Sequence, residues 1–368
     1  MKAAVWYGRR DIRVEEFPDP PSPGEDEIKI QVDWCGLCGT DLEEYLYGPL
    51  YIPVDEPNPL TGVQAPMILG HEFVGTVVEV GPGASGFEVG DIVTPDTLIH
   101  CGKCYWCKRH LVHQCENLAI LGLMTHGGFA EYVNAPTYMC FHLPPGVSSE
   151  VAVLGEPASV AIRANRQGRT SFGDTVAVVG AGTIGLLCLQ TALLAGASEV
   201  YVVEVEASRR ELASEMGAAR VFDPAEVDVV QSIKELTGGR GVDVVLESGG
   251  NAETIALAPQ LACKRGRVVV LSLTNEPVSI NFFPLVCDEI ELIGSFSHVY
   301  DEDFASAVKL LGDGRINAAP LITGRIALDD IVEKGLEELL RDRAGNLKIL
   351  VAPGGLEIWC SRLEQQPR

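Results

Sequence analysis

The chain of 368 residues is too long for one ordinary hydrophobic core, so two domains are expected. Its 46% hydrophobic and 21% charged residues are typical of a globular protein and exclude a disordered chain. Acidic side chains outnumber basic ones by 51 to 28, and the formal net charge of -23 argues against nucleic acids and anionic membranes as partners.

The N-terminal segment carries charges at Arg9, Arg10, Asp11 and Arg13, which leave no room for the apolar core of a signal peptide. We therefore expect a cytoplasmic protein. One uncharged stretch, residues 175–198, has the length of a membrane span. Its glycines, which follow a short valine-rich run, instead favour a buried strand, a tight turn and a buried helix.

Short β segments dominate the first part of the chain. They are apolar or alternate with period two, are separated by proline and glycine, and cover residues 26–36, 73–81, 91–96 and 127–136. This pattern predicts an antiparallel, barrel-like domain.

Sulfur, imidazole and carboxylate side chains are scattered through this part of the chain and just after it. The set comprises Cys38, His71, Glu72 and Glu156, with Thr40 two residues after the cysteine. Such a mixed set is of the kind that catalytic zinc uses, with a position left for water or substrate. Taken singly, His71 is more often a satisfied core histidine and Glu156 a carboxylate at a helix start. Neighbours in a regular strand point to opposite faces, so His71 and Glu72 reach one metal only if the backbone turns there.

Four cysteines cluster in a loop whose other residues are too polar for a core: Cys101, Cys104, Cys107 and Cys115. Thiols of a chain without an export signal should be reduced, so this spacing indicates metal before disulfide. Four thiolates on one loop suit a closed tetrahedral zinc site, with an iron–sulfur cluster as the lesser alternative. Because four sulfurs leave no open coordination position on the metal, we expect this metal to hold the lobe, about residues 96–118, in its folded form. It is expected to take no part in catalysis.

A glycine-rich fingerprint lies between a valine-rich strand and a helix. Its residues are Gly180, Gly182, Thr183, Ile184 and Gly185. The next strand ends in Glu204, whose carboxylate can bind both ribose hydroxyls of an adenosine and repel a 2′-phosphate, so NAD is favoured over NADP. The alternative is that Glu204 is only a surface acid. Arg209 is expected to lie along the adenine face.

Three more short apolar strands alternate with helical segments and predict a parallel sheet wound on both faces. The carboxyl ends of these strands are expected to face the cofactor. The residues at these ends are Ser248, Gly249, Ser272, Leu273, Ser295 and Phe296. After about residue 296 the chain is expected to be helical, and a last strand at residues 346–353 is expected to rejoin the first domain.

Several motifs, taken in order, resemble those of the zinc-dependent medium-chain alcohol dehydrogenases. They are GLCGTD, GHEFVGTVVEVG, the four-cysteine lobe, GGFAEYV, GEP and VVGAGTIGLL, and the resemblance runs from Met1 to about Pro353. Within the family, the 33 positions from Cys38 to His71 and the segment NPLTGVQAPMILGHEF are similar to the 2,3-butanediol dehydrogenase branch. The other motifs are shared with threonine and polyol dehydrogenases.

The resemblance implies an α/β protein with two domains. An N-terminal GroES-like antiparallel β-barrel is the catalytic domain, and a Rossmann domain, a doubly wound parallel sheet, binds NAD. The expected catalytic domain covers residues 1–157 and includes the zinc lobe, the Rossmann domain covers 158–296, and the chain returns to the catalytic domain over 297–353. A tail at residues 354–368 resembles nothing recognisable.

By position in the family's motifs, Cys38, His71 and Glu156 are implied as ligands of a catalytic zinc, and Glu72 as a ligand or near-ligand. We expect the two carboxylates to share this role. Thr40 is implied to pass the alcohol proton outward. The family further implies two zinc ions per chain, NAD, a small alcohol or hydroxyketone as substrate, and a homodimer or homotetramer.

Three functions remain as hypotheses at this point. The first is an NAD-dependent dehydrogenase of 2,3-butanediol and acetoin. The second is an L-threonine 3-dehydrogenase or a sorbitol-type polyol dehydrogenase with the same zinc chemistry. The third is a zinc-stabilised nucleotide-binding or structural protein without catalysis, and the joint presence of Cys38, Thr40, His71 and Glu156 argues against it.

Overall fold

The computed structural model describes residues 1–274 and 277–356, so most of the predicted tail, residues 354–368, lies outside the described residues. The chain divides into two compact units. The first unit comprises Met1–Glu156, Val299–Gly312 and Ala318–Arg368, and the second comprises Pro157–His298 and Asp313–Asn317.

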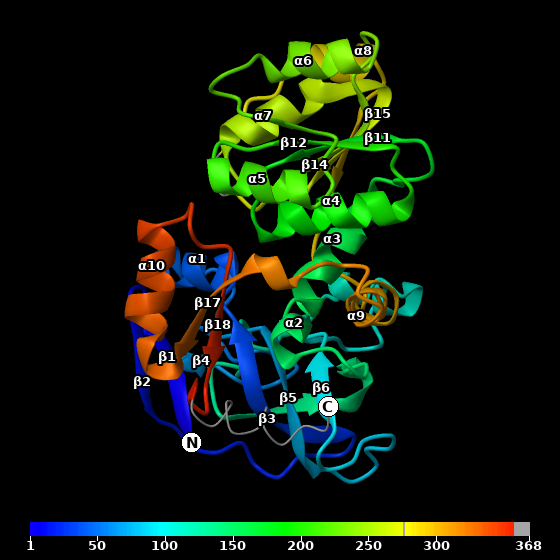
Figure 1. Ribbon diagram of the computed structural model, residues 1–368. Helices are drawn as coiled ribbons and strands as arrows, with labels where there is room; N and C mark the ends of the chain where they lie inside the picture. Colours follow the sequence, from blue (N-terminus) through cyan, green and yellow to red (C-terminus); the bar gives the residue numbers. More distant parts are fainter. Residues whose placement is uncertain (275–276, 357–368) are drawn as a thin grey trace. The chain divides into compact units, whose positions relative to one another are not determined.

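The first unit contains a seven-stranded sheet with the order β10-β6-β5-β3-β18-β17, in which β9 also pairs with β3. Its strands are β3 (Glu27–Gly36), β5 (Glu72–Val80), β6 (Ile92–Pro95), β9 (Tyr132–Pro136), β10 (Cys140–His142), β17 (Ile322–Ala327) and β18 (Lys348–Ala352). The pairs are antiparallel except that of β17 with β18. Because β18 pairs Leu350 with Gly36 of β3, the C-terminal strand lies beside an N-terminal one (Figure 1).

Alternating burial explains why the segment of β3 forms a strand. Ile28, Ile30 and Val32 are buried, and the residues between them are only partly buried. Every second side chain of a strand points to the same face, so these three residues pack together with Phe73 and Val77 of β5 in one core. The antiparallel barrel-like domain that the sequence predicts is confirmed.

Two small sheets and several short helices complete the first unit. One sheet has the order β2-β1-β4 and the other pairs β7 with β8. The strands are β1 (Lys2–Gly8), β2 (Asp11–Glu16), β4 (Met67–Ile68), β7 (Leu98–Ile99) and β8 (Ala119–Ile120). The helices and helical turns are α1 (Gly39–Tyr47), η1 (Cys107–Arg109), η2 (Val112–Gln114), η3 (Thr137–Met139), α2 (Ser149–Ala152), η4 (Tyr300–Phe304), α9 (Ala305–Gly312), η5 (Ala319–Leu321), η6 (Leu328–Asp330), η7 (Ile331–Leu336) and α10 (Glu337–Arg341).

The second unit is a parallel six-stranded sheet with the order β13-β12-β11-β14-β15-β16. Its strands are β11 (Thr175–Val179), β12 (Glu199–Val203), β13 (Arg220–Phe222), β14 (Val242–Glu247), β15 (Ala262–Val270) and β16 (Glu291–Gly294). Its helices are α3 (Gly155–Gln167), which begins at the border of the units, α4 (Thr183–Ala195), α5 (Ala207–Glu215), α6 (Val229–Leu236), α7 (Ala252–Leu261) and α8 (Phe282–Cys287).

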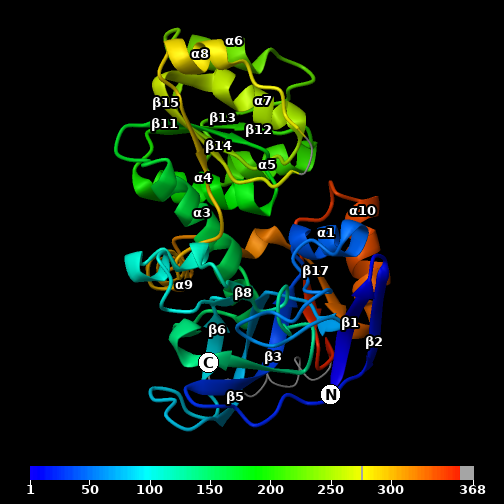
Figure 2. The ribbon, with the colours of Figure 1, turned by 180° about the vertical axis from the view of Figure 1, so that it is seen from behind.

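Helices cover both faces of this sheet. Helices α4 and α5 lie on one side and α6 and α7 on the other, as Figure 1 and the reverse view in Figure 2 both show. The strand order and the helices on both faces are those of a Rossmann fold, as the sequence predicts.

The uncharged stretch at residues 175–198 forms β11, a glycine turn and the buried helix α4. Among the described residues, no helix has the length and apolarity that a membrane span requires. The prediction of a buried strand and helix is therefore correct.

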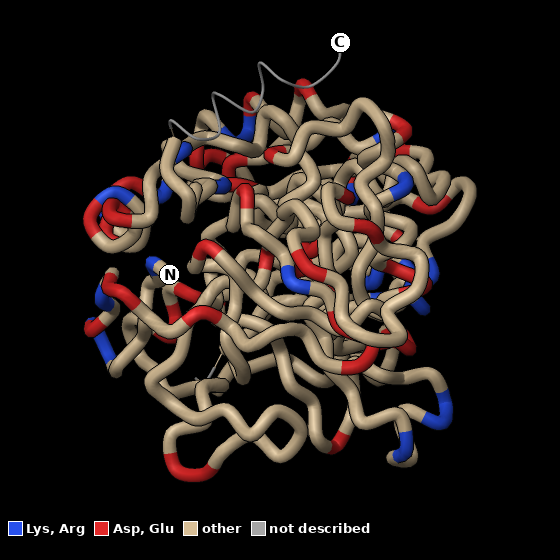
Figure 3. Tube along the Cα trace, turned by 90° about the horizontal axis from the view of Figure 1, so that it is seen from below, with Lys and Arg blue, Asp and Glu red and all other residues tan. Residues whose placement is uncertain are grey.

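Acidic residues occur along many loops and helices of the chain in Figure 3, with basic residues between them. Many of the basic side chains are paired with acids at the surface, as Arg325 is with Glu150 at 2.6 Å and Lys2 with Asp329 at 2.5 Å. The acidic charge is thus spread over the surface and does not by itself mark a binding site.

Candidate active site and metal lobe

Three of the predicted zinc ligands lie together in the first unit. One donor atom from each of Cys38, His71 and Glu72 lies within 4.8 Å of the other two. Cys38 directly precedes α1, Glu72 is the first residue of β5, and His71 directly precedes that strand. The histidine and the glutamate are 5% and 1% exposed, so their donor atoms are shielded from bulk water.

The backbone turns where these two ligands adjoin. Gly70 has a φ of +94°, and a Cβ added there would lie 2.7 Å from Cys35 Sγ. Glycine adopts this conformation and leaves this space, so the chain can turn tightly before the strand. Strand β5 begins only at Glu72, which leaves His71 outside the regular pleat. The turn therefore meets the condition under which neighbouring side chains can approach one metal.

A buried carboxylate that the sequence analysis did not single out supports this group. Asp41 lies in the first turn of α1 and is fully buried, and its Oδ2 accepts a hydrogen bond from the backbone N–H of Cys38 at 2.9 Å. Its Oδ1 lies 3.5 Å from His71 Nδ1. The only sequence signal for Asp41 is its place near a helix start, where acids are common because they cap the helix and interact favourably with its dipole. A carboxylate in this position orients an imidazole that binds a metal.

A buried lysine contacts the group from the far end of the chain. Lys348 Nζ donates to Glu72 Oε2 at 2.5 Å and to the backbone carbonyl of Leu37 at 2.9 Å. Burial lowers the pKa of this lysine, but the charges of Glu72 and Cys38 outweigh it, and the pKa is raised above its ordinary value. Both contacts are with acceptor oxygens, which suit the hydrogen-bond-donating ammonium form. The sequence analysis missed it because a lysine in an apolar strand has no local signal of its partner.

Thr40 and Glu156 lie around this group in different ways. Thr40 Oγ1 is 3.8 Å from Cys38 Sγ. Glu156, the second residue of α3, is partly buried and acts electrostatically on Lys348. Among the described residues, however, the carboxylate gathered with Cys38 and the histidine is that of Glu72.

The gathered donors fit a zinc ion. A thiolate, an imidazole nitrogen and a carboxylate form the kind of set that catalytic zinc takes, with a further position open. His71 Nδ1 and Asp41 Oδ1 are buried and make no hydrogen bond. The two atoms face each other at 3.5 Å, so a proton on Nδ1 points at the carboxylate and Nε2 is the nitrogen left to bind a metal.

The four cysteines of the predicted lobe also lie together, with their sulfur atoms within 4.8 Å of one another. Cys104 Sγ is 3.4 Å from Cys107 Sγ, and Cys101 Sγ is 4.0 Å from Cys107 Sγ. Four sulfurs at about 2.3 Å from a tetrahedral zinc are about 3.8 Å apart, so this spacing fits zinc. The turns η1 and η2 fold the loop back so that Cys115 joins the other three.

Backbone N–H groups in the lobe point at sulfur. The N–H of Cys107 donates to Cys104 Sγ at 3.5 Å, and that of Cys101 to Cys115 Sγ at 3.3 Å. Backbone N–H donors, above all that of Cys107, lower the pKa of Cys104 to about 6, whereas burial raises the pKa of Cys107 to about 12. Donors of this kind stabilise thiolates, which are the form that binds a metal.

In the second unit, the glycine fingerprint forms the turn between β11 and α4. Helix α4 begins at Thr183, with Ile184 next, so the N–H groups of its first turn follow Gly182 directly. Gly180 has a φ of +93°, and a Cβ at Gly185 would lie 1.9 Å from Gly180 O. Helix and strand therefore pack closely, and the helix N-terminus presents N–H groups suited to a phosphate.

Glu204 follows β12 and is only 7% exposed. Its Oε2 accepts a hydrogen bond from Ala181 N at 2.6 Å, and its Oε1 accepts one from Glu206 N at 2.9 Å. The carboxylate therefore lies against the glycine turn. Arg209 is partly buried in the first turn of α5, and its neighbour Arg210 pairs with Asp223 at 2.8 Å.

The ends of β14 and β15 are tied together by Glu247, a fully buried residue that the sequence analysis did not single out. Its Oε1 accepts hydrogen bonds from Gly249 N at 2.9 Å and Gly250 N at 3.1 Å, and its Oε2 accepts one from the Ser272 hydroxyl. Ser248 Oγ donates to Gly180 O at 3.1 Å, so four predicted cofactor residues, Gly180, Ser248, Gly249 and Ser272, lie at one edge of the sheet. The available sequence signal for Glu247 was that it is an acidic residue at the end of an apolar strand.

The remaining predicted cofactor residues follow the last two strands. Leu273 lies after β15 and is 49% exposed. Ser295, after β16, donates its N–H to Val270 O at 2.9 Å, and Phe296 is partly buried beside it.

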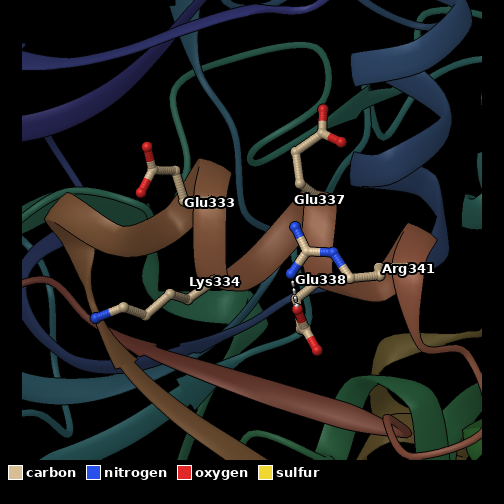
Figure 4. Close-up of a pocket in the computed structure, with 5 residues that line it drawn as sticks. All are labelled: Glu333, Lys334, Glu337, Glu338 and Arg341. Carbon is tan, nitrogen blue, oxygen red and sulfur yellow. Dashed lines mark hydrogen bonds and ion pairs between the residues drawn. The ribbon is translucent and has the colours of Figure 1, made fainter.

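A cavity of about 620 Å³ lies elsewhere, along η7 and α10 (Figure 4). Several of its charged side chains have partners. Arg341 bonds to Glu338 at 2.7 Å, and Glu337 accepts a hydrogen bond from Tyr45 at 2.8 Å. None of the predicted site residues lines it, so this cavity is not the candidate active site.

Two family models match the chain. The alcohol dehydrogenase GroES-like domain matches residues 24–145, and the zinc-binding dehydrogenase domain matches residues 183–313. These ranges contain the four-cysteine lobe together with Cys38, His71 and Glu72 in the first case, and most of the six-stranded sheet in the second.

Full-length relatives agree with these models. The chain is 39% identical to (R,R)-butanediol dehydrogenase of Bacillus subtilis over 96% of this chain and 100% of that protein. It is 36% identical to L-threonine 3-dehydrogenase of Pyrococcus abyssi over 95% of this chain and 97% of that protein.

Solved structures give the same result. The crystal structure of 2R,3R-butanediol dehydrogenase from Bacillus subtilis matches with a TM-score of 0.88 at 38% identity, covering 96% of this chain and 99% of that one. A zinc-binding dehydrogenase from Sinorhizobium meliloti 1021 bound to NADP matches with a TM-score of 0.86 at 34% identity, with the same coverage. The chain is therefore an oxidoreductase that belongs to the zinc-dependent medium-chain alcohol dehydrogenase family.

Proposed function

We propose that the protein oxidises a vicinal diol to a hydroxyketone with NAD and catalyses the reverse reduction, with 2,3-butanediol and acetoin as the substrate pair. The observation that carries the chemistry is the group of Cys38, His71 and Glu72, whose donor atoms lie within 4.8 Å of one another. The substrate assignment is supported by the 39% identity to the Bacillus subtilis butanediol dehydrogenase. The long segment between the cysteine and the histidine, which resembles that branch, also supports it.

In this proposal, Cys38 and His71 hold zinc together with a carboxylate from Glu72 or Glu156, and Cys101, Cys104, Cys107 and Cys115 hold a second zinc. A zinc ion held by the first set would supply a Lewis acid that lowers the pKa of an alcohol hydroxyl. Thr40 accepts the hydroxyl proton and passes it outward. Asp41 keeps the imidazole oriented, and the glycine turn of the second unit holds the dinucleotide that receives the hydride.

Glu204 selects NAD in this proposal. Each of its carboxylate oxygens accepts one backbone hydrogen bond, and each retains a lone pair with which it can accept a ribose hydroxyl. The same charge repels a 2′-phosphate. Because the Sinorhizobium meliloti relative was solved with NADP, the assay compares both cofactors.

The decisive assay uses the purified protein with a panel of substrates: 2,3-butanediol, acetoin, sorbitol, L-threonine and ethanol, each with NAD or NADP. Formation or loss of reduced nicotinamide gives kcat/KM for each pair. We expect acetoin and 2,3-butanediol with NAD to give the highest values. Faster turnover of ethanol or threonine than of acetoin contradicts the assignment.

A second candidate is L-threonine 3-dehydrogenase or a sorbitol-type dehydrogenase, because relatives with these names are 36% and 31% identical to the chain. The zinc chemistry is the same in both cases. The same panel distinguishes these activities from a diol dehydrogenase.

We also propose a homodimer or homotetramer. In the second unit, Phe282, Phe283 and Val286 of α8 are 66%, 76% and 73% exposed. Within the described residues, β16, the strand that follows α8 in the chain, ends the sheet and has β15 as its sheet neighbour. An apolar face beside an open strand edge is suited to contact a second copy of the chain.

A further inference from the structure

The contact between Lys348 and Glu72 is unusual because both side chains are almost inaccessible. They are 4% and 1% exposed, and Nζ lies 2.5 Å from Glu72 Oε2. A buried ammonium ion is retained only where acceptors replace its water. Here the carboxylate and the carbonyl of Leu37 take two of its three N–H groups.

Three neighbouring strands build the space for this pair. Gly36 of β3 is opposite Glu72 of β5 on one side and opposite Leu350 of β18 on the other. A Cβ added at Gly36 would lie 2.4 Å from Glu72 Oε2 and 3.2 Å from Lys348 Cδ. The absence of a side chain at this position leaves room for the carboxylate and the ammonium group to meet.

The pair adjoins the donor atoms of Cys38 and His71. The Glu72 carboxylate belongs to that group and bonds to Lys348 at the same time. One of its oxygen atoms is therefore fixed by the ammonium ion. The ammonium charge also offsets the negative charges of the carboxylate and of a Cys38 thiolate, which lie close together in a site shielded from water.

We propose that Lys348 is a positioning residue of the catalytic zinc site: it fixes the Glu72 carboxylate beside Cys38 and His71 and so sets how tightly the site holds zinc. This inference rests on the proposed zinc function of that group. Lys348 itself is not a ligand, because its charged form donates hydrogen bonds and has no lone pair. It acts through Glu72.

The test measures zinc retention in the full-length protein charged with zinc. Wild type and Lys348→Met are mixed with a chelator that develops colour with zinc, and the loss of each zinc ion is followed over time. We expect Lys348→Met to lose one zinc about 10- to 100-fold faster than wild type, because removing a partner of a metal ligand typically lowers metal affinity by about this factor. The lobe zinc is expected to leave at an unchanged rate and serves as an internal reference.

A cobalt-substituted protein gives a second readout that does not depend on turnover. Its visible bands report the ligands around the metal, so a displaced Glu72 shifts them in Lys348→Met. Lys348→Arg, which keeps the charge and the donors, is expected to restore most of the wild-type spectrum. Lys29→Met is the matched control, because Lys29 also pairs with a glutamate across the sheet, Glu79 at 2.9 Å, but away from the donor group.

The double variant Glu72→Gln with Lys348→Met separates a positioning role from a merely structural one. It removes both charges of the buried pair, so it can be used if Lys348→Met alone fails to fold. If the lysine acts through Glu72, adding Lys348→Met to Glu72→Gln changes the zinc-release rate by less than about twofold. A further tenfold acceleration in that background overturns the inference. So does a Lys348→Met protein with wild-type release rates and cobalt spectrum. A wild-type protein that holds only the lobe zinc instead refutes the proposed catalytic function.

Discussion

At the scale of single residues, the site depends on side chains that perform one task locally and another for the cofactor. Glu204 illustrates this, because its carboxylate stabilises the glycine turn through Ala181 N and Glu206 N in addition to its proposed ribose contact. The sequence motif predicts the ribose contact. The hydrogen bonds to Ala181 N and Glu206 N depend on where the end of β12 places the Glu204 side chain. The motif does not specify this position.

Replacing Glu204 with serine is expected to relax cofactor choice. Removing a buried charge that repels the 2′-phosphate is worth about 1–4 kcal/mol, so the kcat/KM ratio of NADP to NAD should rise about tenfold or more. Steady-state kinetics with both cofactors measures this ratio. Glu215→Ser, at the exposed end of α5, is the control and should leave the ratio unchanged. Equal discrimination in Glu204→Ser and wild type would show that another residue selects the cofactor.

At the scale of elements, local patterns predict the fold well, and contacts between distant segments explain what they miss. The glycine turn and the cysteine spacing are local, so the sequence alone indicates them. Lys348 and Glu72 are 276 residues apart, and their contact exists only because β18 pairs with β3 beside β5. Asp41 and Glu247 are ordinary acids in the sequence, and only burial next to backbone N–H groups distinguishes them.

The cysteine lobe is expected to need its metal to fold. Cys104→Ala removes one of four sulfurs, so the zinc content should fall from two ions per chain to one. The free energy of unfolding should fall by about 3 kcal/mol or more, because binding of a structural zinc is coupled to folding. Elemental analysis and thermal unfolding measure both effects. Cys287→Ala, an exposed thiol in α8, should change neither. An unchanged zinc count in Cys104→Ala contradicts a four-cysteine site.

The loop before β9 is expected to make stability depend on pH. Burial lowers the pKa of His126 below its ordinary value of 6.5, and its Nδ1 accepts the N–H of Ile68 at 3.2 Å, so the folded protein holds the ring neutral. The unfolded chain takes up this proton near pH 6.5 and the folded chain only at lower pH. This histidine therefore contributes stability above pH 6.5 that is lost as the pH falls from 6.5 towards the folded pKa.

The substitution His126→Asn tests this origin of the pH dependence, since an amide oxygen can still accept the Ile68 N–H. Urea unfolding between pH 7.5 and about 5 gives the free energy of unfolding at each pH. As the pH falls, the free energy of unfolding should decrease more steeply for wild type than for the variant. Because one histidine takes up at most one proton, the two slopes should differ by at most about 1.4 kcal/mol per pH unit. Parallel curves would assign the acid sensitivity to other groups.

At the scale of the whole molecule, the two units are interleaved along the chain. The second unit, chiefly Pro157–His298, is inserted between parts of the first, and β18, close to the end of the described chain, completes the sheet that β3 begins. The second unit can form its sheet from one nearly continuous segment, whereas the first needs both ends of the chain. Loop-closure entropy therefore favours earlier folding of the second unit.

The open strand β16 and the apolar face of α8 lead to a prediction about assembly. Introducing Glu at Phe283 and Val286 together places two charges where a second copy is proposed to pack, and an unpaired buried charge opposes association. Light scattering coupled to size-exclusion chromatography should show wild type as a dimer or tetramer and the double variant as a species of half that mass. Zinc content and circular dichroism should be retained, because both residues are already exposed in the chain. Phe172→Glu is the matched control, an aromatic residue that is 93% exposed elsewhere in the second unit, and it should leave the mass unchanged. A double variant with the wild-type mass would place the contact between copies on another face.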